Sequence, residues 1–168
     1  MKHKEVSDEL TEKIRQRVYS GMGFIAMHSA HHSKPFKAIL GTTGNLTWGR
    51  EQKGVVWNVA ASHPITEGIP AHFEIFEELY SEPFYIPTPD ELLFVTWFED
   101  GNVFRGGATW KRGLGKIFYF HPGHETCNSF YNEYVQKILS NAVRWCAPAK
   151  LHNDFDGAVI HQFDPVIK

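Results

Sequence analysis

The sequence predicts an α/β domain whose mostly parallel sheet lies between two layers of helices. The segment 23–28 is short and almost wholly apolar, which is the pattern of a parallel strand covered on both faces. A polar turn and a short helix follow it directly, so strand and helix alternate along the chain. Two longer segments, 7–20 and 129–146, repeat apolar residues at helical spacing. We expect one domain over residues 1–168, a length that suits a single hydrophobic core.

Serine residues mark the starts of two of the three expected helices. Ser7 is a suitable N-cap for a helix over 7–20, in which apolar residues recur every fourth position. Ser33 can cap a short helix over 33–40. The last helix, over 129–146, has the widest apolar stripe.

The other apolar segments predict strands, which are expected at 23–28, 55–60, 73–80, 91–98, 103–110 and 116–120. The last two flank KRGLG, a loop of hairpin length. Only one helix precedes the strand at 23–28, so one side of that buried strand lacks a neighbour unless later strands flank it. We favour a missing N-terminal β-α-β part, and we expect an exposed sheet edge and a homodimer.

Composition narrows the function classes. The formal charge is -2 and no basic stripe is visible, so nucleic acid is a poor candidate partner. No apolar run is long enough to span a membrane, and the first ten residues do not resemble a signal peptide. Cys127 and Cys146 are too few for a disulfide framework and suggest reduced thiols in the cytoplasm. We expect no nucleotide cofactor.

Histidine clusters follow two of the expected strands. The strand at 23–28 runs into HSAHHS, with His28 and His31, and the strand at 116–120 runs into HPGHET, with His124 and Glu125. Ligands bind at the C-terminal ends of strands in open α/β sheets, so these side chains can share one pocket if the strands are neighbours. Imidazoles and carboxylates suit a zinc-like divalent metal held by His28 and His31, with His124 as a further ligand. A metal-free polar pocket is the alternative.

Three further interpretations concern catalysis. Glu125 is either a general base that works with His124 or a group that only holds His124 in one tautomer. Gly123 indicates backbone close to a ligand, although a plain turn also explains it. Cys127 is a weaker candidate nucleophile, because the best strand-to-helix turn carries HSAHHS and no cysteine.

Several polar and aromatic side chains near strand ends suit a sugar. Glu77, Glu78 and Tyr80 end one strand, and Arg105 and Trp110 occupy another. Carboxylates and phenols hydrogen-bond sugar hydroxyls, and indoles cover the apolar faces of sugar rings. The competing interpretation of the tryptophans is that most of them belong to the core.

Five motifs follow one another along the chain: MHSAHHSKPFKAILGTTGNLTW, SHPITEGIP, EELY, FRGGATWKRGLGKIFYFHPGHET and NAVRWCAP. In this order they resemble the trehalose-utilisation (ThuA-like) family. The resemblance implies a fold like that of class I glutamine amidotransferases, which is flavodoxin-like, without their catalytic cysteine. It also implies roles for Lys34, Glu78, Tyr80 and Gly123 around a sugar. The family's preceding G-H-x-x-H loop survives only as a tail at residues 3–6, which strengthens the expectation of a missing N-terminal part.

The predicted function is therefore an enzyme that acts on a keto-disaccharide or another small sugar derivative. His124 and Glu125 would move protons, and His28 and His31 would bind metal or polarise a carbonyl. The alternative is a non-catalytic carbohydrate-binding or accessory subunit on the same scaffold.

Overall fold

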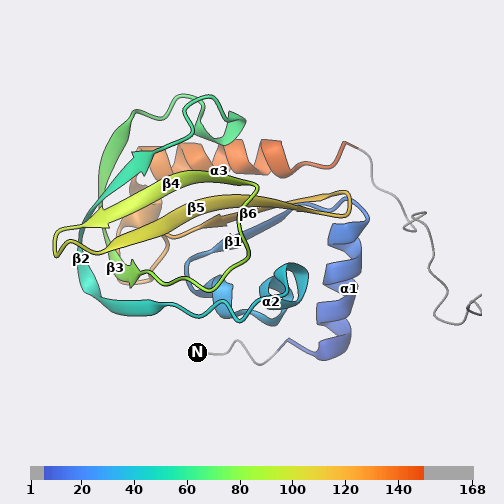
Figure 1. The fold of residues 1–168 in the computed structure, drawn as a ribbon. Coiled ribbons are helices and arrows are strands. Elements are labelled where there is room, and N and C mark those ends of the chain that lie inside the picture. The colour runs from blue at the N-terminus through green and yellow to red at the C-terminus, as the bar shows by residue number, and fades with distance from the viewer. Residues whose placement is uncertain (1–5, 150–168) are drawn as a thin grey trace, which may run out of the picture.

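The computed structural model describes residues 6–149 (Figure 1). Its six strands form one sheet in the order β1-β6-β5-β4-β2-β3. The strands are β1 (Phe24–Met27), β2 (Thr47–Asn58), β3 (His72–Ser81), β4 (Glu91–Phe98), β5 (Val103–Arg112) and β6 (Gly115–Phe120). The helices are α1 (Asp8–Tyr19), α2 (Lys34–Leu40) and α3 (Glu133–Cys146). Short 3₁₀ turns lie at His28–His32, Pro64–Thr66 and Ser129–Tyr131.

The prediction of a mostly parallel sheet is wrong. Among the strands of residues 6–149, only β1 and β6 run parallel, and the other four pairings are antiparallel. A parallel pair needs a crossover of a dozen or more residues, whereas short turns join β4 to β5 and β5 to β6. The alternating exposed and buried residues in the first part of β3 are also typical of an antiparallel strand with one solvated face.

The predicted helices and strands themselves are confirmed, with small shifts at their ends. Ser7 caps α1 by accepting the N–H of Leu10, and Ser33 caps α2 by accepting the N–H of Phe36. The large difference is β2, which begins at Thr47 and not near 55. Its first half is polar and contains a bulge, so no apolar alternation marked it as a strand.

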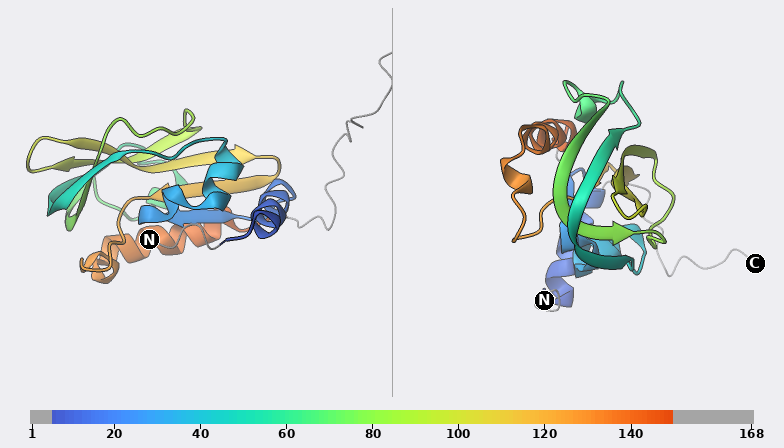
Figure 2. Two further views of the ribbon diagram at one scale, coloured as in Figure 1. Left: turned by 90° about the horizontal axis from the view of Figure 1, so that it is seen from below. Right: turned by 90° about the vertical axis from the view of Figure 1, so that its left-hand side faces the viewer.

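Helices cover both sides of the parallel pair β1–β6. One core cluster packs α1 and α2 against the sheet, and it includes Val18, Phe36 and Trp110. A second cluster packs α3 against the other side, through residues such as Val135 and Ile138. Figure 2 shows that the sheet curls strongly between these layers. Because it curls, the far edge strand β3 approaches the end of β1.

Within residues 6–149, β1 pairs with β6 and with no other strand. No helix in that part of the chain is long and apolar enough to cross a membrane. The predicted tail at residues 3–6 lies, except for Val6, outside the described residues.

Candidate functional site

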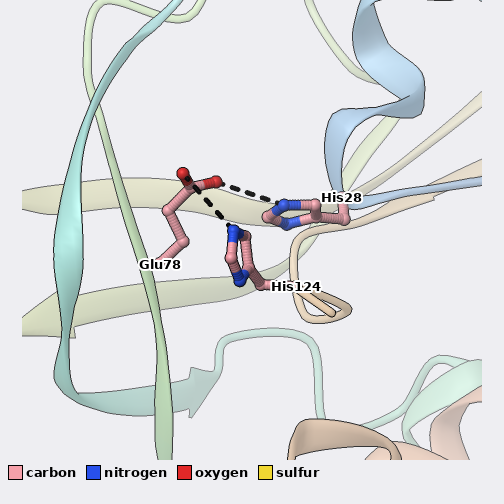
Figure 3. Close-up of side chains that lie close together, drawn as sticks. All are labelled: His28, Glu78 and His124. Carbon is pink, nitrogen blue, oxygen red and sulfur yellow. Dashed lines mark ion pairs between the residues drawn. The ribbon is translucent and has the colours of Figure 1, made fainter. Parts of the chain in front are cut away.

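The parallel pairing of β1 and β6 brings the two histidine clusters together. Met27 pairs with Phe120 at the last position of the register, so the residues that follow both strands emerge at one edge of the sheet. The ring centroids of His28 and His124 lie 5.2 Å apart. The predicted convergence of the clusters is therefore present, and β3 adds Glu78 to it (Figure 3). Tyr80 of the same strand lies 3.3 Å from His28 Nε2.

His28 is held in one orientation and in a rare backbone conformation. Its φ of 47° lies in the left-handed region, which costs of order 1 kcal/mol or more for a residue other than glycine. Its Nδ1 lies 3.2 Å from the carbonyl oxygen of His121, and the hydroxyl of Tyr119 donates a hydrogen bond to the carbonyl of His28. Because a carbonyl can only accept, Nδ1 carries the proton. The Nε2 of the neutral ring therefore presents a lone pair, 3.2 Å from Glu78 Oε2.

A second chain of hydrogen bonds orients His124. Its Nδ1 lies 2.7 Å from Thr126 Oγ1, and the hydroxyl of Thr126 donates to Glu51 Oε1 at 2.9 Å. The pKa of Glu51 is lowered, first by a hydrogen bond from its own backbone N–H and then by that of Thr126, so the carboxylate is ionised. The backbone N–H of Thr126 also points at this Nδ1, at 3.3 Å, so Thr126 holds the ring from two sides. The Nε2 of His124 then faces Glu78 Oε1 at 3.8 Å.

His28, Glu78 and His124 thus form a cluster that can hold a metal ion, with the three ligand atoms within 4.8 Å of one another. Ligand atoms around a tetrahedral zinc ion lie roughly 3.4 Å apart, given metal–ligand distances of about 2.1 Å. The distance from Glu78 Oε2 to His28 Nε2 is 3.2 Å, and that from Glu78 Oε1 to His124 Nε2 is 3.8 Å, so each histidine lies near that separation from one oxygen of the carboxylate. The side chains of Glu78 and His124 keep 15% and 16% of their surface exposed, which leaves the cluster open on one side.

Burial disfavours the charged forms of two residues in this cluster. Burial raises the pKa of Glu78, and burial lowers the pKa of His28. The Nε2 of His28 faces a Glu78 oxygen and also the Tyr80 hydroxyl, which lies 3.3 Å away and can donate to it. A bound cation would take the place of that hydrogen bond, and the donor set of two imidazoles and one carboxylate suits zinc.

Glu77 anchors the loop that carries His124. Its buried carboxylate accepts hydrogen bonds from the backbone N–H groups of Glu78, Gly123 and His124 and from the Ser129 hydroxyl. Burial is the largest single influence on the pKa of Glu77 and by itself would raise it, but the hydrogen bonds from Ser129, Gly123 and Glu78 together outweigh burial. The pKa therefore lies below its usual value and the group is ionised.

Comparison with known proteins identifies the family. A family model described as ThuA, trehalose utilisation, matches residues 1–146. The chain belongs to the ThuA family. No curated protein matches the chain.

Solved structures share the fold of this ThuA protein at low identity. A ThuA-like protein of Parabacteroides merdae has a TM-score of 0.67 and 18% identity, over 88% of this chain and 68% of its own. One from Bacteroides uniformis has a TM-score of 0.62 and 19% identity, over 89% and 67%. A cytoplasmic protein of Salmonella typhimurium has a TM-score of 0.57 and 13% identity, over 86% and 63%.

The other predicted site residues of the ThuA chain have different surroundings. Lys34 donates to Asp8 of α1, and Arg105 makes paired hydrogen bonds to Glu82. Trp110 is fully buried and donates to a backbone carbonyl, that of Pro87. None of these contacts involves the cluster.

The remaining candidates lie close to the cluster. Glu125 reaches within 3.9 Å of His124 Nε2, but 85% of its side chain is exposed. His31 is buried, and its Nδ1 donates to the Gly44 carbonyl at 2.6 Å. The metal-capable group among the described residues includes Glu78 and not His31. The backbone N–H of Gly123 donates a hydrogen bond to the carboxylate of Glu77.

Sequence reasoning missed the supporting residues of the ThuA site. Glu77 was noticed only as part of a carboxylate pair, although a glutamate inside an apolar strand is a signal of a buried polar role. Glu51 and Thr126 gave no such signal, because one lies in a polar stretch and the other in a turn. Cys127 is buried, which raises the pKa of its thiol to about 11.

Proposed function

We propose that this protein acts on a keto-sugar or disaccharide derivative at the cluster of His28, Glu78 and His124, with a divalent metal of the zinc type bound there. The observation that carries the proposal is the orientation of the two imidazoles. Each has its Nδ1 held by a neighbouring group, and each turns its Nε2 toward a different oxygen of one carboxylate. Family membership supports a carbohydrate substrate.

A bound divalent ion at this place supplies Lewis acidity toward a carbonyl or lowers the pKa of a bound water. The residues of the chain do the rest. Glu78 and the two histidines hold the ion, and the exposed Glu125 exchanges protons with solvent beside His124. The phenol of Tyr80, 3.3 Å from His28 Nε2, can donate to a sugar oxygen. The homodimer and the cytoplasmic location stay predictions.

The test compares turnover with and without metal. Protein stripped with a chelator and protein reloaded with zinc are incubated with a keto-disaccharide, and product is followed by NMR. We expect turnover only in the zinc-loaded protein, and none in His124→Ala. A matched control is His72→Ala, because His72 is an exposed histidine on β3 outside the cluster.

Two results would separate the alternatives. Unchanged turnover by His124→Ala would refute the assignment of the centre. Saturable sugar binding that ignores chelators, with no product after long incubation, would favour the non-catalytic carbohydrate-binding subunit instead.

A further inference from the structure

A bulge in β2 places the side chains of Trp48 and Glu51 on the side of the sheet that carries the metal-capable cluster. Trp48 pairs with Tyr80, and Glu51 pairs with Glu78, so β2 has one residue more than β3 between these pairs. Residues three apart on a regular strand face opposite sides of the sheet. The extra residue cancels this alternation, and both Trp48 and Glu51 share the face of Glu78 and Tyr80.

The sequence at the bulge fits this conformation. At Gly49, a Cβ atom would lie only 2.9 Å from Cδ2 of Leu79, so a larger residue there would require the Leu79 side chain to shift. Bulges of this kind often aim a side chain at a functional site. The consequence here is an indole that stays 66% exposed although Tyr80, its partner in register, is buried.

A small cavity joins this indole to the cluster. It measures about 80 Å³ and is lined by Ser29, His31, His32, Leu46, Trp48, Glu78 and Tyr80. Glu78 and Tyr80 belong both to this cavity and to the surroundings of His28. The cavity is small beside the roughly 300–1,000 Å³ of usual ligand pockets, so only a substituent of a ligand can enter it. The body of that ligand must then lie against the exposed Trp48.

We infer that Trp48 is the stacking platform of a saccharide subsite, on which a gluco-configured pyranose ring rests while one of its hydroxyl substituents enters the cavity toward Glu78. This inference rests on the proposed function and adds one wall to that site. Equatorial hydroxyls leave the faces of such a ring lined by C–H groups, which pack on an indole. The hydroxyls at its edge reach carboxylate and phenol oxygens.

The experiment measures binding of trehalose to the full chain by titration calorimetry. Mannitol, an acyclic polyol without a ring face, is the ligand control. We expect wild-type protein to bind trehalose and not mannitol. Trp48→Ala should raise the Kd for trehalose roughly tenfold or more, the loss expected for one aromatic contact, and Trp48→Phe should recover most of it. Trp97→Ala is the matched control, because Trp97 is 55% exposed on β4 and does not line the cavity.

Zinc titration of the same variants separates this inference from the proposed function. Trp48 is not among the metal-capable residues, so Trp48→Ala should keep wild-type zinc affinity. A trehalose Kd that is equal in wild type and Trp48→Ala, or no trehalose binding by wild type, overturns the inference. Trehalose binding that depends on Trp48, in a protein that neither binds zinc nor turns over keto-sugar, supports the subsite and refutes the proposed function.

Discussion

The change Glu77→Gln tests whether one buried carboxylate holds the loop that carries His124 in place. Glutamine has nearly the same volume, but it replaces one carboxylate oxygen by an amide group that donates. Oε1 now accepts from the N–H groups of Glu78 and His124 at 2.9 and 3.2 Å, and Oε2 accepts from Gly123 and Ser129 at 2.8 and 2.5 Å. An amide can serve only one of these two pairs.

The cost follows from the donors that lose their acceptor. The Ser129 hydroxyl can rotate and accept from the new amide, whereas the N–H of Gly123 faces a donor and has no alternative. A buried unsatisfied donor costs about 1–3 kcal/mol, and hydrogen bonds to a charged group are worth about 1.5–3 kcal/mol. We expect Glu77→Gln to lower the free energy of unfolding by about 3 kcal/mol, and to lower Tm by about 6–12 °C in a protein of this size.

Urea unfolding followed by circular dichroism measures the stability, and zinc titration measures the cluster. The zinc affinity of Glu77→Gln should also fall, because the backbone of His124 is no longer fixed. Glu74→Gln is the matched control, since Glu74 is exposed on the same strand. A free energy of unfolding within about 0.5 kcal/mol of wild type, the usual range for surface changes, would refute the reasoning, as would unchanged zinc affinity.

Three other outcomes are expected. Thr126→Val should weaken zinc binding about 10–100-fold by releasing His124, with Thr126→Ser close to wild type; equal affinities by calorimetry would contradict the hydrogen-bond chain. The pKa of Glu82 is lowered: burial is the largest single influence and by itself would raise it, but hydrogen bonds, chiefly from Arg105, outweigh burial. The resulting stabilisation is present above roughly pH 4.3 and is lost as the pH falls through the folded-state pKa. The difference in free energy of unfolding between wild type and Arg105→Met, measured with urea, should therefore become smaller in acid. A difference that stays constant with pH would argue against this ion pair. Cys127, whose pKa burial raises to about 11, should react slowly with iodoacetamide in mass spectrometry at pH 7.5, and labelling as fast as that of a free thiol would show an exposed thiolate.

The sequence predicted the convergence of the two histidine clusters for a physical reason. Strands 23–28 and 116–120 are mostly apolar, and buried parallel neighbours end at the same edge of a sheet. His28 and His124 were therefore placed together correctly. Glu78 was also recognised, from its position near the end of a strand and from the family motif.

Other parts of the structure depend on contacts that no local pattern records. The antiparallel majority of the sheet follows from loop lengths, which were visible at KRGLG but were outweighed by the strand-turn-helix succession around 23–40. Arg105 is engaged by Glu82, which the strand pattern gives no reason to expect. The roles of Trp48 and Glu51 require the bulge in β2, which breaks the period of two that sequence reasoning uses.

The most direct test of the centre is X-ray diffraction from crystals soaked in zinc, with data collected above and below the zinc absorption edge. We expect one anomalous peak between His28 Nε2, His124 Nε2 and the carboxylate of Glu78, about 2.0–2.2 Å from each ligand atom. The peak should be absent in crystals of Glu78→Gln. Peaks only elsewhere on the surface, or a peak that persists in Glu78→Gln, would contradict the proposed metal centre.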